Sequence, residues 1–382
     1  DNQVFDIGSG AALTISPVIK GDAGTRGFTK TGAGTLTLRG ANTYGGDTTL
    51  GGGKLVAMAN ASALSTGALT LNGASTTLEL DNNSGLSFNN NTTVSADVAI
   101  NSGRLTSGAG VTHTLGTLSI GTDTLTIAGG SNVISGTAQI TFGNVTLTGS
   151  PTFMVNNPSG GGTTTLSLGA MNNGANTATF GGNGDVVQTG VWGNGAGGIT
   201  YSGTGSLTLS QANTYTGGTT LSSGKLVLGP SGSISSSPQI LVSSGATFDV
   251  SQVTGVFNLG SGQWLGGAGA VTGNVKVTGG TLRPNTTLSF SNTLAFIGSA
   301  TNYFSLTSAP SSAANDQIVV GGNLSLSGVS TIVVSYTNIG VGRYKLITYR
   351  GTRSGGTNNL RLITSGPLRV MYLDASIANE ID

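Results

Sequence analysis

The sequence predicts an all-β fold and, within that class, favours a parallel β-helix in which coils of short strands stack on one another. Three observations support this prediction. Short segments of alternating apolar and polar residues run almost from end to end, glycine supplies 66 of the 382 residues, and one 26-residue segment occurs twice. Only 8% of the residues are charged, whereas disordered chains are usually rich in charge. We therefore expect an ordered structure.

The alternating segments place apolar residues two positions apart, which puts both side chains on one face of a strand. In the first half of the chain these pairs are Leu69/Leu71, Leu78/Leu80, Val98/Ile100, Leu118/Ile120, Leu125/Ile127, Ile140/Phe142, Val145/Leu147 and Leu166/Leu168. In the second half they are Phe248/Val250, Phe257/Leu259, Val275/Val277, Leu288/Phe290, Leu294/Phe296 and Phe304/Leu306. The segments are very short, glycine pairs interrupt them and Asn-Gly hairpin turns are few. These features favour parallel coils over an array of antiparallel β-sandwiches.

The repeated segment reads GAGTLTLRGANTYGGDTTLGGGKLVA from Gly32 and GTGSLTLSQANTYTGGTTLSSGKLVL from Gly203. The two copies align without a gap, and 17 of the 26 positions are identical. Such self-similarity is typical of solenoids, because each unit buries its apolar face against its neighbours. We therefore expect the leucines of the two copies to be buried at equivalent positions, namely Leu36/Leu207, Leu38/Leu209 and Leu50/Leu221.

Two other residues of the repeat have predicted local roles. Tyr44 is expected to cover a turn with its ring and to keep its hydroxyl group in water. Gly53 is expected at a corner where a side chain would obstruct the backbone.

The chain divides into two predicted regions. Residues 1–314 form the solenoid, with repeat copies at about 32–57 and 203–228, and residues 315–382 form a C-terminal capping β-region. The capping region is predicted because its apolar segments are longer and because the open strand edges at the end of a solenoid need cover. It also holds six basic residues: Arg343, Lys345, Arg350, Arg353, Arg361 and Arg369.

The repeated residues resemble a known family. The pattern G-x-G-x-L-x-L-x-x-x-N-T-Y-x-G-x-T-x-L-x-x-G-x-L, matched at Gly32–Leu55 and Gly203–Leu226, is similar to the autotransporter-associated β-strand repeat, also called the passenger-associated transport repeat. The segment Leu265–Pro284 resembles the linker that follows this repeat, and Asp316–Gly351 resembles a C-terminal region that assists folding.

The resemblance implies a right-handed parallel β-helix that is exported to the surface of a Gram-negative-type bacterium. The chain begins at Asp1 without a signal peptide, and no translocator segment follows the repeats. We therefore expect a mature or excised fragment, or a different route of export.

Residues able to carry out chemistry are few. The chain has no cysteine and one histidine, which excludes Cys–His catalysis and metal sites built from several Cys or His ligands. That histidine, His113, shares its parity with Val111 and Leu115, so we expect it to point inward or to lie at a corner.

The acidic residues are scattered. Glu79 and Asp81 are two positions apart, and we expect both on a solvated strand face because they alternate with buried leucines. The segment Gly181–Asp185 resembles a calcium-binding glycine-rich repeat, but Asp185 falls one position early and no tandem copies follow. We therefore predict no catalytic, cofactor-binding or metal-binding residue.

These observations predict a non-enzymatic extracellular β-solenoid, the passenger or stalk of a surface or secreted bacterial protein. It would act in adhesion or as a structural surface component, binding glycans or surface polymers and associating with copies of itself, end to end or side by side. The alternative is a carbohydrate-active β-helix enzyme, a polysaccharide lyase or hydrolase, in which distant acids converge on one face. A net charge of +1 gives no field that attracts nucleic acid, and no apolar run is long enough for membrane insertion.

Overall fold

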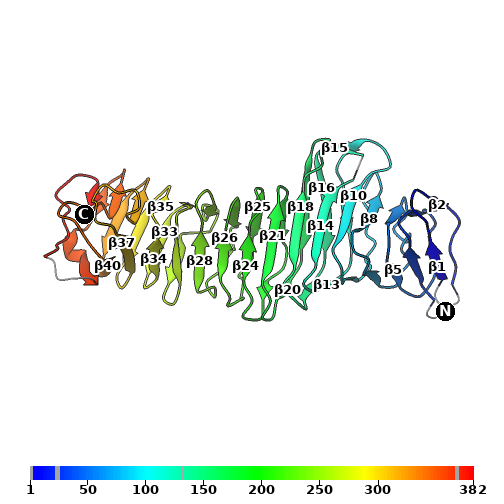
Figure 1. Cartoon of the computed structure of the whole chain (residues 1–382), viewed down its shortest axis with the longest axis horizontal. Helices are drawn as coiled ribbons and strands as arrows, with labels where there is room; N and C mark the ends of the chain where they lie inside the picture. The colour runs from blue at the N-terminus through cyan, green and yellow to red at the C-terminus, as the bar shows by residue number, and fades with distance from the viewer. Residues whose placement is uncertain (1–2, 22–25, 131, 366–369) are drawn as a thin grey trace. The chain divides into compact units, whose positions relative to one another are not determined.

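A computed structural model describes residues 3–21, 26–130, 132–365 and 370–382 of the chain. Within these residues the regular structure is β-strand, apart from one short 3-10 turn, η1 (Thr357–Asn359). Among the described strands the pairing is parallel, with one exception, β41 against β44 (Figure 1). The predicted all-β, parallel β-solenoid is therefore confirmed.

The chain divides into two compact units, Asp1–Gln211 and Ala212–Asp382. In the first unit, one sheet runs through β1 (Gln3–Asp6), β3 (Phe28–Thr31), β5 (Thr48–Leu50), β7 (Leu69–Leu71), β9 (Thr92–Val94), β13 (Leu118–Ile120), β17 (Val145–Leu147), β20 (Met171–Asn172) and β23 (Trp192–Gly193). A second runs through β2 (Ala12–Ile15), β4 (Thr35–Leu38), β6 (Lys54–Met58), β8 (Thr76–Asp81), β10 (Val98–Gly103), β14 (Thr124–Gly129), β18 (Thr152–Asn156), β21 (Ala178–Gly182) and β24 (Ile199–Tyr201).

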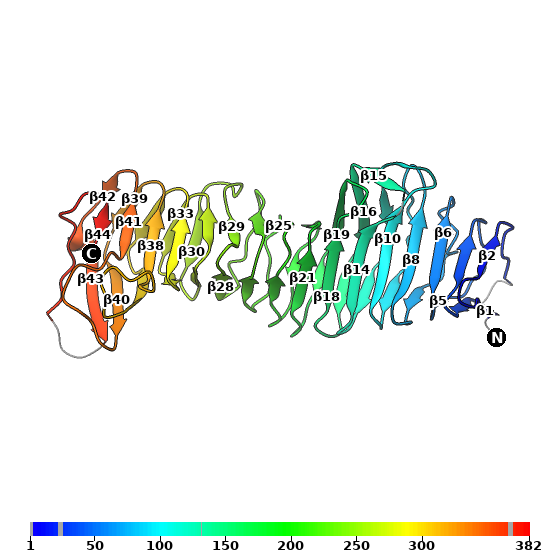
Figure 2. The same cartoon turned by 45° about the horizontal axis from the view of Figure 1, so that its top comes forward.

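A third sheet of the first unit begins several coils later. It runs through β12 (Thr112–Thr114), β16 (Thr137–Phe142), β19 (Thr163–Leu168), β22 (Asp185–Gln188) and β25 (Ser206–Leu209). The short strands β11 (Gly108–Ala109) and β15 (Val133–Ser135) pair with each other, and β15 lies at the outer edge of the unit (Figure 2).

The described strands of the second unit belong to three sheets. One runs through β26 (Thr219–Leu221), β28 (Gln239–Val242), β31 (Trp264–Gly267), β34 (Thr281–Pro284), β37 (Thr301–Leu306), β40 (Ser330–Tyr336) and β43 (Leu360–Ser365). The next runs through β27 (Lys225–Leu228), β29 (Thr247–Asp249), β32 (Ala270–Thr272), β35 (Thr287–Phe290), β38 (Gln317–Val320), β41 (Ile347–Tyr349) and β44 (Glu380–Ile381). The last runs through β30 (Phe257–Gly260), β33 (Val275–Thr278), β36 (Leu294–Ile297), β39 (Leu324–Ser327) and β42 (Arg353–Ser354).

Parallel pairing continues past residue 315 in this unit, through β38 and β40. The short strand β44 then reverses direction and pairs with β41. The role of residues 315–382 as a cap stays a prediction.

The interior is a ladder of apolar side chains held in register from coil to coil. In the first unit one rung follows another through Leu13, Leu36, Leu55, Leu78, Ile100, Ile127 and Val155. The predicted repeat leucines Leu36, Leu38, Leu50, Leu207, Leu209 and Leu221 are all fully buried, which confirms their burial. The two copies occupy different sheets, because β4 lies in the sheet of β2 and β6 whereas β25 lies in the sheet of β19 and β22. The threonines between them face outward and are partly exposed, because successive residues of a strand point to opposite faces.

Glycine lies where two coils approach each other closely. Gly53 has a φ of 64°, and its equivalent in the second copy, Gly224, has a φ of 62°. A Cβ atom on Gly53 would lie 2.4 Å from the carbonyl oxygen of Gly34. The predicted corner role of Gly53 is therefore correct, for reasons of both backbone conformation and space.

The prediction that the Tyr44 hydroxyl lies in water is wrong. Tyr44 is only 3% exposed, and its hydroxyl lies 2.6 Å from Oγ1 of Thr48. The second copy has the same contact, 2.8 Å between Tyr215 and Thr219. Burial raises the pKa of both tyrosines above its ordinary value. The threonine four residues after the tyrosine therefore recurs in the repeat as the buried partner that its hydroxyl needs.

We expect Leu36→Ala and Leu207→Ala each to lower the free energy of unfolding by about 2–5 kcal/mol, because each removes a fully buried side chain and leaves a cavity. The outward-facing Thr37→Ala is the matched control and should change it by less than about 0.5 kcal/mol. Urea unfolding followed by circular dichroism measures all three variants. Equal losses for Leu36→Ala and Thr37→Ala would contradict the assignment of the two faces.

The Tyr44–Thr48 contact predicts a non-additive pair of substitutions. Thr48→Val alone should cost about 1–3 kcal/mol, because it leaves the tyrosine hydroxyl buried without a partner. Combining it with Tyr44→Phe should cost less than the sum of the two single changes, since no polar group is then left unpaired. A double-mutant cycle by urea unfolding measures this coupling, and strict additivity would count against the contact.

Candidate functional site

The single histidine is part of the core. His113, in β12, is fully buried. Its Nδ1 accepts a hydrogen bond from the backbone N–H of Leu86 at 3.1 Å, and its Nε2 lies 3.2 Å from the carbonyl oxygen of Gly103. A neutral ring that is protonated on Nε2 satisfies both contacts. Burial lowers the pKa of His113, so the ring stays neutral and joins the loop at Leu86 to the end of β10. The side chain points inward, as its parity predicted.

The prediction that Glu79 and Asp81 lie on a solvated face is wrong. They alternate with the core leucines of β8 as expected, but they are only 5% and 6% exposed. The reason is the neighbouring backbone. A Cβ atom on Gly103 would lie 2.0 Å from Oδ1 of Asp81, and one on Gly130 would lie 3.0 Å from Oε1 of Glu79. Two glycines therefore let the following coils cover both carboxyl groups.

The buried pair has unusual electrostatics. Lys54 of β6 forms an ion pair with Glu79. Burial, together with the negative charge of Glu79, raises the pKa of Asp81 to about 7, and the Lys54 ammonium opposes this rise. Oδ1 of Asp81 has no hydrogen-bond partner. Glycoside hydrolases use two carboxyl groups in different protonation states, but here neither group is exposed enough to reach a substrate.

Lys30 is a buried charge that sequence reasoning missed. It is fully buried in β3, and its Nζ donates to the carbonyl oxygens of Thr31 at 2.6 Å, Gly32 at 2.8 Å and Gly52 at 3.0 Å. Burial lowers its pKa. The signal was present in the sequence, because Lys30 shares its parity with the buried Phe28. All three ammonium protons have acceptors, so Lys30 joins coils and is not available as a nucleophile.

Asp185 is also used within the stack. Its Oδ1 accepts hydrogen bonds from the N–H of Ser206 at 2.9 Å and from the Ser206 hydroxyl at 2.7 Å. Within the described parts of the chain, no three His, Cys, Asp or Glu residues come together in a way that would hold a metal ion. The predicted absence of a calcium site at Gly181–Asp185 stays a prediction.

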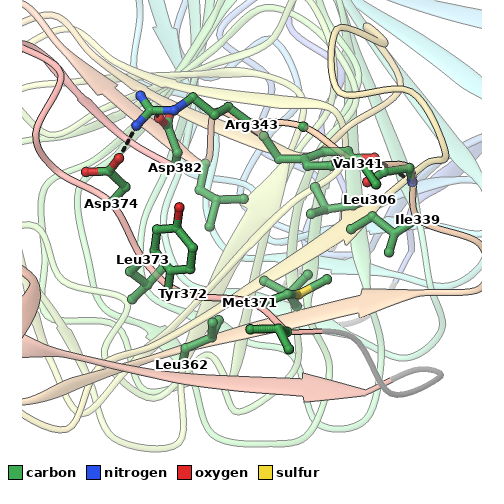
Figure 3. Close-up of a pocket in the computed structure, with 16 residues that line it drawn as sticks. Leu306, Ile339, Val341, Arg343, Leu362, Met371, Tyr372, Leu373, Asp374 and Asp382 are labelled. Carbon is green, nitrogen blue, oxygen red and sulfur yellow. Dashed lines mark hydrogen bonds and ion pairs between the residues drawn. The ribbon is translucent and has the colours of Figure 1, made fainter.

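A cavity of about 580 Å³ lies in the second unit, between β37, β40, β43, the loop that follows β40 and residues 370–374 (Figure 3). Its lining is largely apolar and includes Leu306, Val334, Leu362, Met371, Tyr372 and Leu373. At its rim Arg343 pairs with Asp374 and, at 3.2 Å, with Asp382. The Arg343 guanidinium therefore engages one oxygen of each carboxylate at the rim of a largely apolar cavity.

The predicted basic residues near the C-terminus are not a single free cluster. Arg343 is paired as described, and Lys345 lies 3.1 Å from Glu380. Arg353 lies over the ring of Tyr349, with its Cζ 6.0 Å from the ring centroid. Arg369 lies outside the described residues. Acids from the end of the chain therefore neutralise at least two of the six.

The raised pKa of Asp81 predicts a dependence of stability on pH. A carboxyl group whose pKa is higher in the folded state stabilises that state below its ordinary pKa of 3.8 and loses this contribution as the pH rises through about 7. In that interval each pH unit should lower the free energy of unfolding by up to about 1.4 kcal/mol.

Asp81→Asn removes the titrating carboxyl group. The difference between the free energies of unfolding of the wild type and the variant, taken at each pH, therefore reports the titration of Asp81 alone. Urea unfolding at a series of pH values measures both proteins. Two curves that stay parallel from about pH 4 to pH 8 would show that Asp81 titrates normally.

Comparison with known proteins finds the passenger-associated-transport-repeat family at residues 28–57 and 199–228. No curated protein matches the chain. In the described residues, no helix has the length and apolar character needed to cross a membrane. The two family matches cover the two copies of the repeat, whose leucines are buried alike and whose glycines and tyrosine–threonine pairs have the same local geometry. The chain therefore contains two passenger-associated transport repeats within a parallel β-solenoid, a combination that fits an autotransporter passenger repeat protein.

Proposed function

We propose that this passenger acts outside the cell, on the bacterial surface or released from it, in adhesion or as a structural surface component, and that it does so without catalysis. The observation that carries the proposal is the use made of the repeat. Its leucines, tyrosine and glycine are all engaged in stacking one coil on the next. Stacking preserves a long outer surface while its residues vary, as in other solenoids that bind through extended faces.

The positions of the ionisable residues support a non-enzymatic role. Glu79 and Asp81 are covered by backbone, Lys30 is satisfied by three carbonyl oxygens, and His113 joins the loop at Leu86 to the end of β10. The carboxylates that line the cavity of the second unit, Asp374 and Asp382, are paired with Arg343. The carbohydrate-active enzyme, the alternative that the sequence left open, would require carboxyl groups that a sugar can reach.

Self-association is part of the proposal and has its own support. Leu13 of β2 is in register with the fully buried Leu36, yet it is 39% exposed. Val4 of β1 is 62% exposed. An exposed strand edge with apolar side chains is a surface on which a further strand can pair, and the partner proposed for it is a second copy of this chain.

Beads coated with the purified protein should adhere to glycan-coated surfaces or to bacterial cells, and the protein should sediment as dimers or larger species at high concentration. The same preparation should release no reducing ends and no unsaturated sugars from a polysaccharide panel. Beads coated with an unrelated protein of similar charge are the control for adhesion. The proposal fails if the protein neither adheres nor associates, or if it releases sugar products that Glu79→Gln abolishes.

A further inference from the structure

Three side chains from consecutive coils meet on the outer side of the sheet of the second unit that runs from β26 to β43. They are Trp264 of β31, Arg283 of β34 and Tyr303 of β37. The three strands are hydrogen-bonded in this order, with Trp264 opposite Thr281 and Thr281 opposite Thr301, and β34 and β37 are seen side by side in Figure 1. The residues that alternate with them, Leu265, Leu282 and Phe304, are at most 1% exposed and fill the core. Trp264, Arg283 and Tyr303 therefore point outward, and we call them the Arg283 cluster.

The arginine of the cluster lies between two aromatic rings. Its Cζ is 5.5 Å from the Trp264 ring centroid and 5.1 Å from the Tyr303 ring centroid, within the range of cation–π attraction. Gly266, opposite Arg283 in the ladder, leaves the room for this arrangement. A Cβ atom there would lie 3.0 Å from Cβ of Arg283 and 2.2 Å from its carbonyl oxygen. The rings and the glycine together orient the guanidinium.

The charge of this guanidinium is not neutralised. Within the part of the chain that the structure describes, the Arg283 side chain has no hydrogen bond and no ion pair, whereas Lys225, Arg343 and Lys345 of this unit pair with acids. The seven strands that the second unit contributes to this sheet contain no Asp or Glu. A guanidinium that contacts rings and makes no hydrogen bond keeps its N–H groups free, and those groups match the two oxygens of a carboxylate.

The aromatic rings remain open to a ligand as well. Tyr303 is 42% exposed and Trp264 is partly exposed, whereas the other tryptophan, Trp192, is 1% exposed. Aromatic residues are only 5% of the chain, and nearly all of the large ones are in the core. An outward tryptophan and tyrosine beside an unpaired arginine are therefore unusual for this molecule. Partly exposed aromatic rings with polar tips favour ligands that have both apolar and polar faces.

We propose that the Arg283 cluster binds acidic glycans. The carboxylate of a uronic acid pairs with the Arg283 guanidinium, and the apolar C–H face of a pyranose ring packs on Trp264 or Tyr303. The partly exposed threonines Thr281 and Thr301, in register beside the cluster, offer hydroxyl groups to the sugar. The charge of the site selects sugars with a carboxylate over neutral ones. This inference rests on the adhesion role proposed above and names the class of ligand for it.

The experiment uses the full chain and oligosaccharides of galacturonate, alginate and hyaluronan, with binding measured by calorimetry and by tryptophan fluorescence. The wild type should bind at least one of them, and its fluorescence should change because Trp264 is at the site. Arg283→Gln and Trp264→Ala should each weaken binding about tenfold or more, as expected for loss of a charge-assisted bidentate contact or of an aromatic anchor. Arg283→Lys should restore only part of the affinity, because an ammonium cannot bind in a fork.

Two controls are matched to these variants. Lys276→Gln removes an exposed positive charge from β33, which belongs to a different sheet, and should leave the affinity within about twofold, because screened charges on another face contribute little. Fully methyl-esterified galacturonate keeps the sugar and loses the charge, and should bind weakly to the wild type and equally to Arg283→Gln. Because the substituted side chains are on the surface, unfolding midpoints should match those of the wild type.

The remaining outcomes overturn the inference, and they distinguish its failure from failure of the proposed adhesion role. If adhesion is unchanged in Arg283→Gln and Trp264→Ala, the protein adheres through a site other than the Arg283 cluster. Binding to phosphatidylserine vesicles or to single-stranded DNA with the same dependence on Arg283, in the absence of glycan binding, would replace the glycan with another anion. A wild type that adheres to no surface would remove the proposed function itself.

Discussion

Parallel, in-register hydrogen bonding between successive coils is the constraint on which the rest of this structure depends. It holds each inward side chain directly over one in the coil before, so that Leu36, Leu55 and Leu78 form a continuous apolar column. A single register error would turn the column outward, because adjacent strand residues face opposite sides. The column therefore fixes register, and register in turn fixes what every outward residue meets.

The same constraint places backbone from one coil against polar side chains of another. The repeat distance between coils is that of paired strands, about 4.8 Å, so a side chain at a strand end is covered whenever the next coil lacks a Cβ. Gly103 and Gly130 cover Glu79 and Asp81 in this way. The carbonyl oxygens at a corner do the same for Lys30. Burial of charge in this solenoid is thus a product of stacking, and each buried group is paired or changes its pKa.

Side chains on the outer faces are not required to pack in the stacked core, and their identity differs from coil to coil. The side chains of Trp264, Arg283 and Tyr303 are not part of the apolar core, which is filled by their neighbours in the same strands. Their arrangement leaves two aromatic rings exposed and a cation without a counter-charge. Exposed aromatic and arginine side chains are the residue types enriched where proteins bind partners, which is the basis of the ligand site proposed for this cluster.

The sequence by itself determined the class of fold and the inward positions. Period-two alternation and the gap-free second copy of the repeat were enough to place Leu36, Leu207 and Gly53, because local sterics and apolar burial act within a few residues of each position. Tertiary structure decided which outward residues are covered and which meet. Whether the Tyr44 hydroxyl or the Asp81 carboxyl touches water depends on the backbone of another coil. The Arg283 cluster joins residues from three coils whose lengths differ, so no fixed spacing in the sequence marks it. Stacking brings together residues that the chain separates by one coil, and only the folded register shows which ones they are.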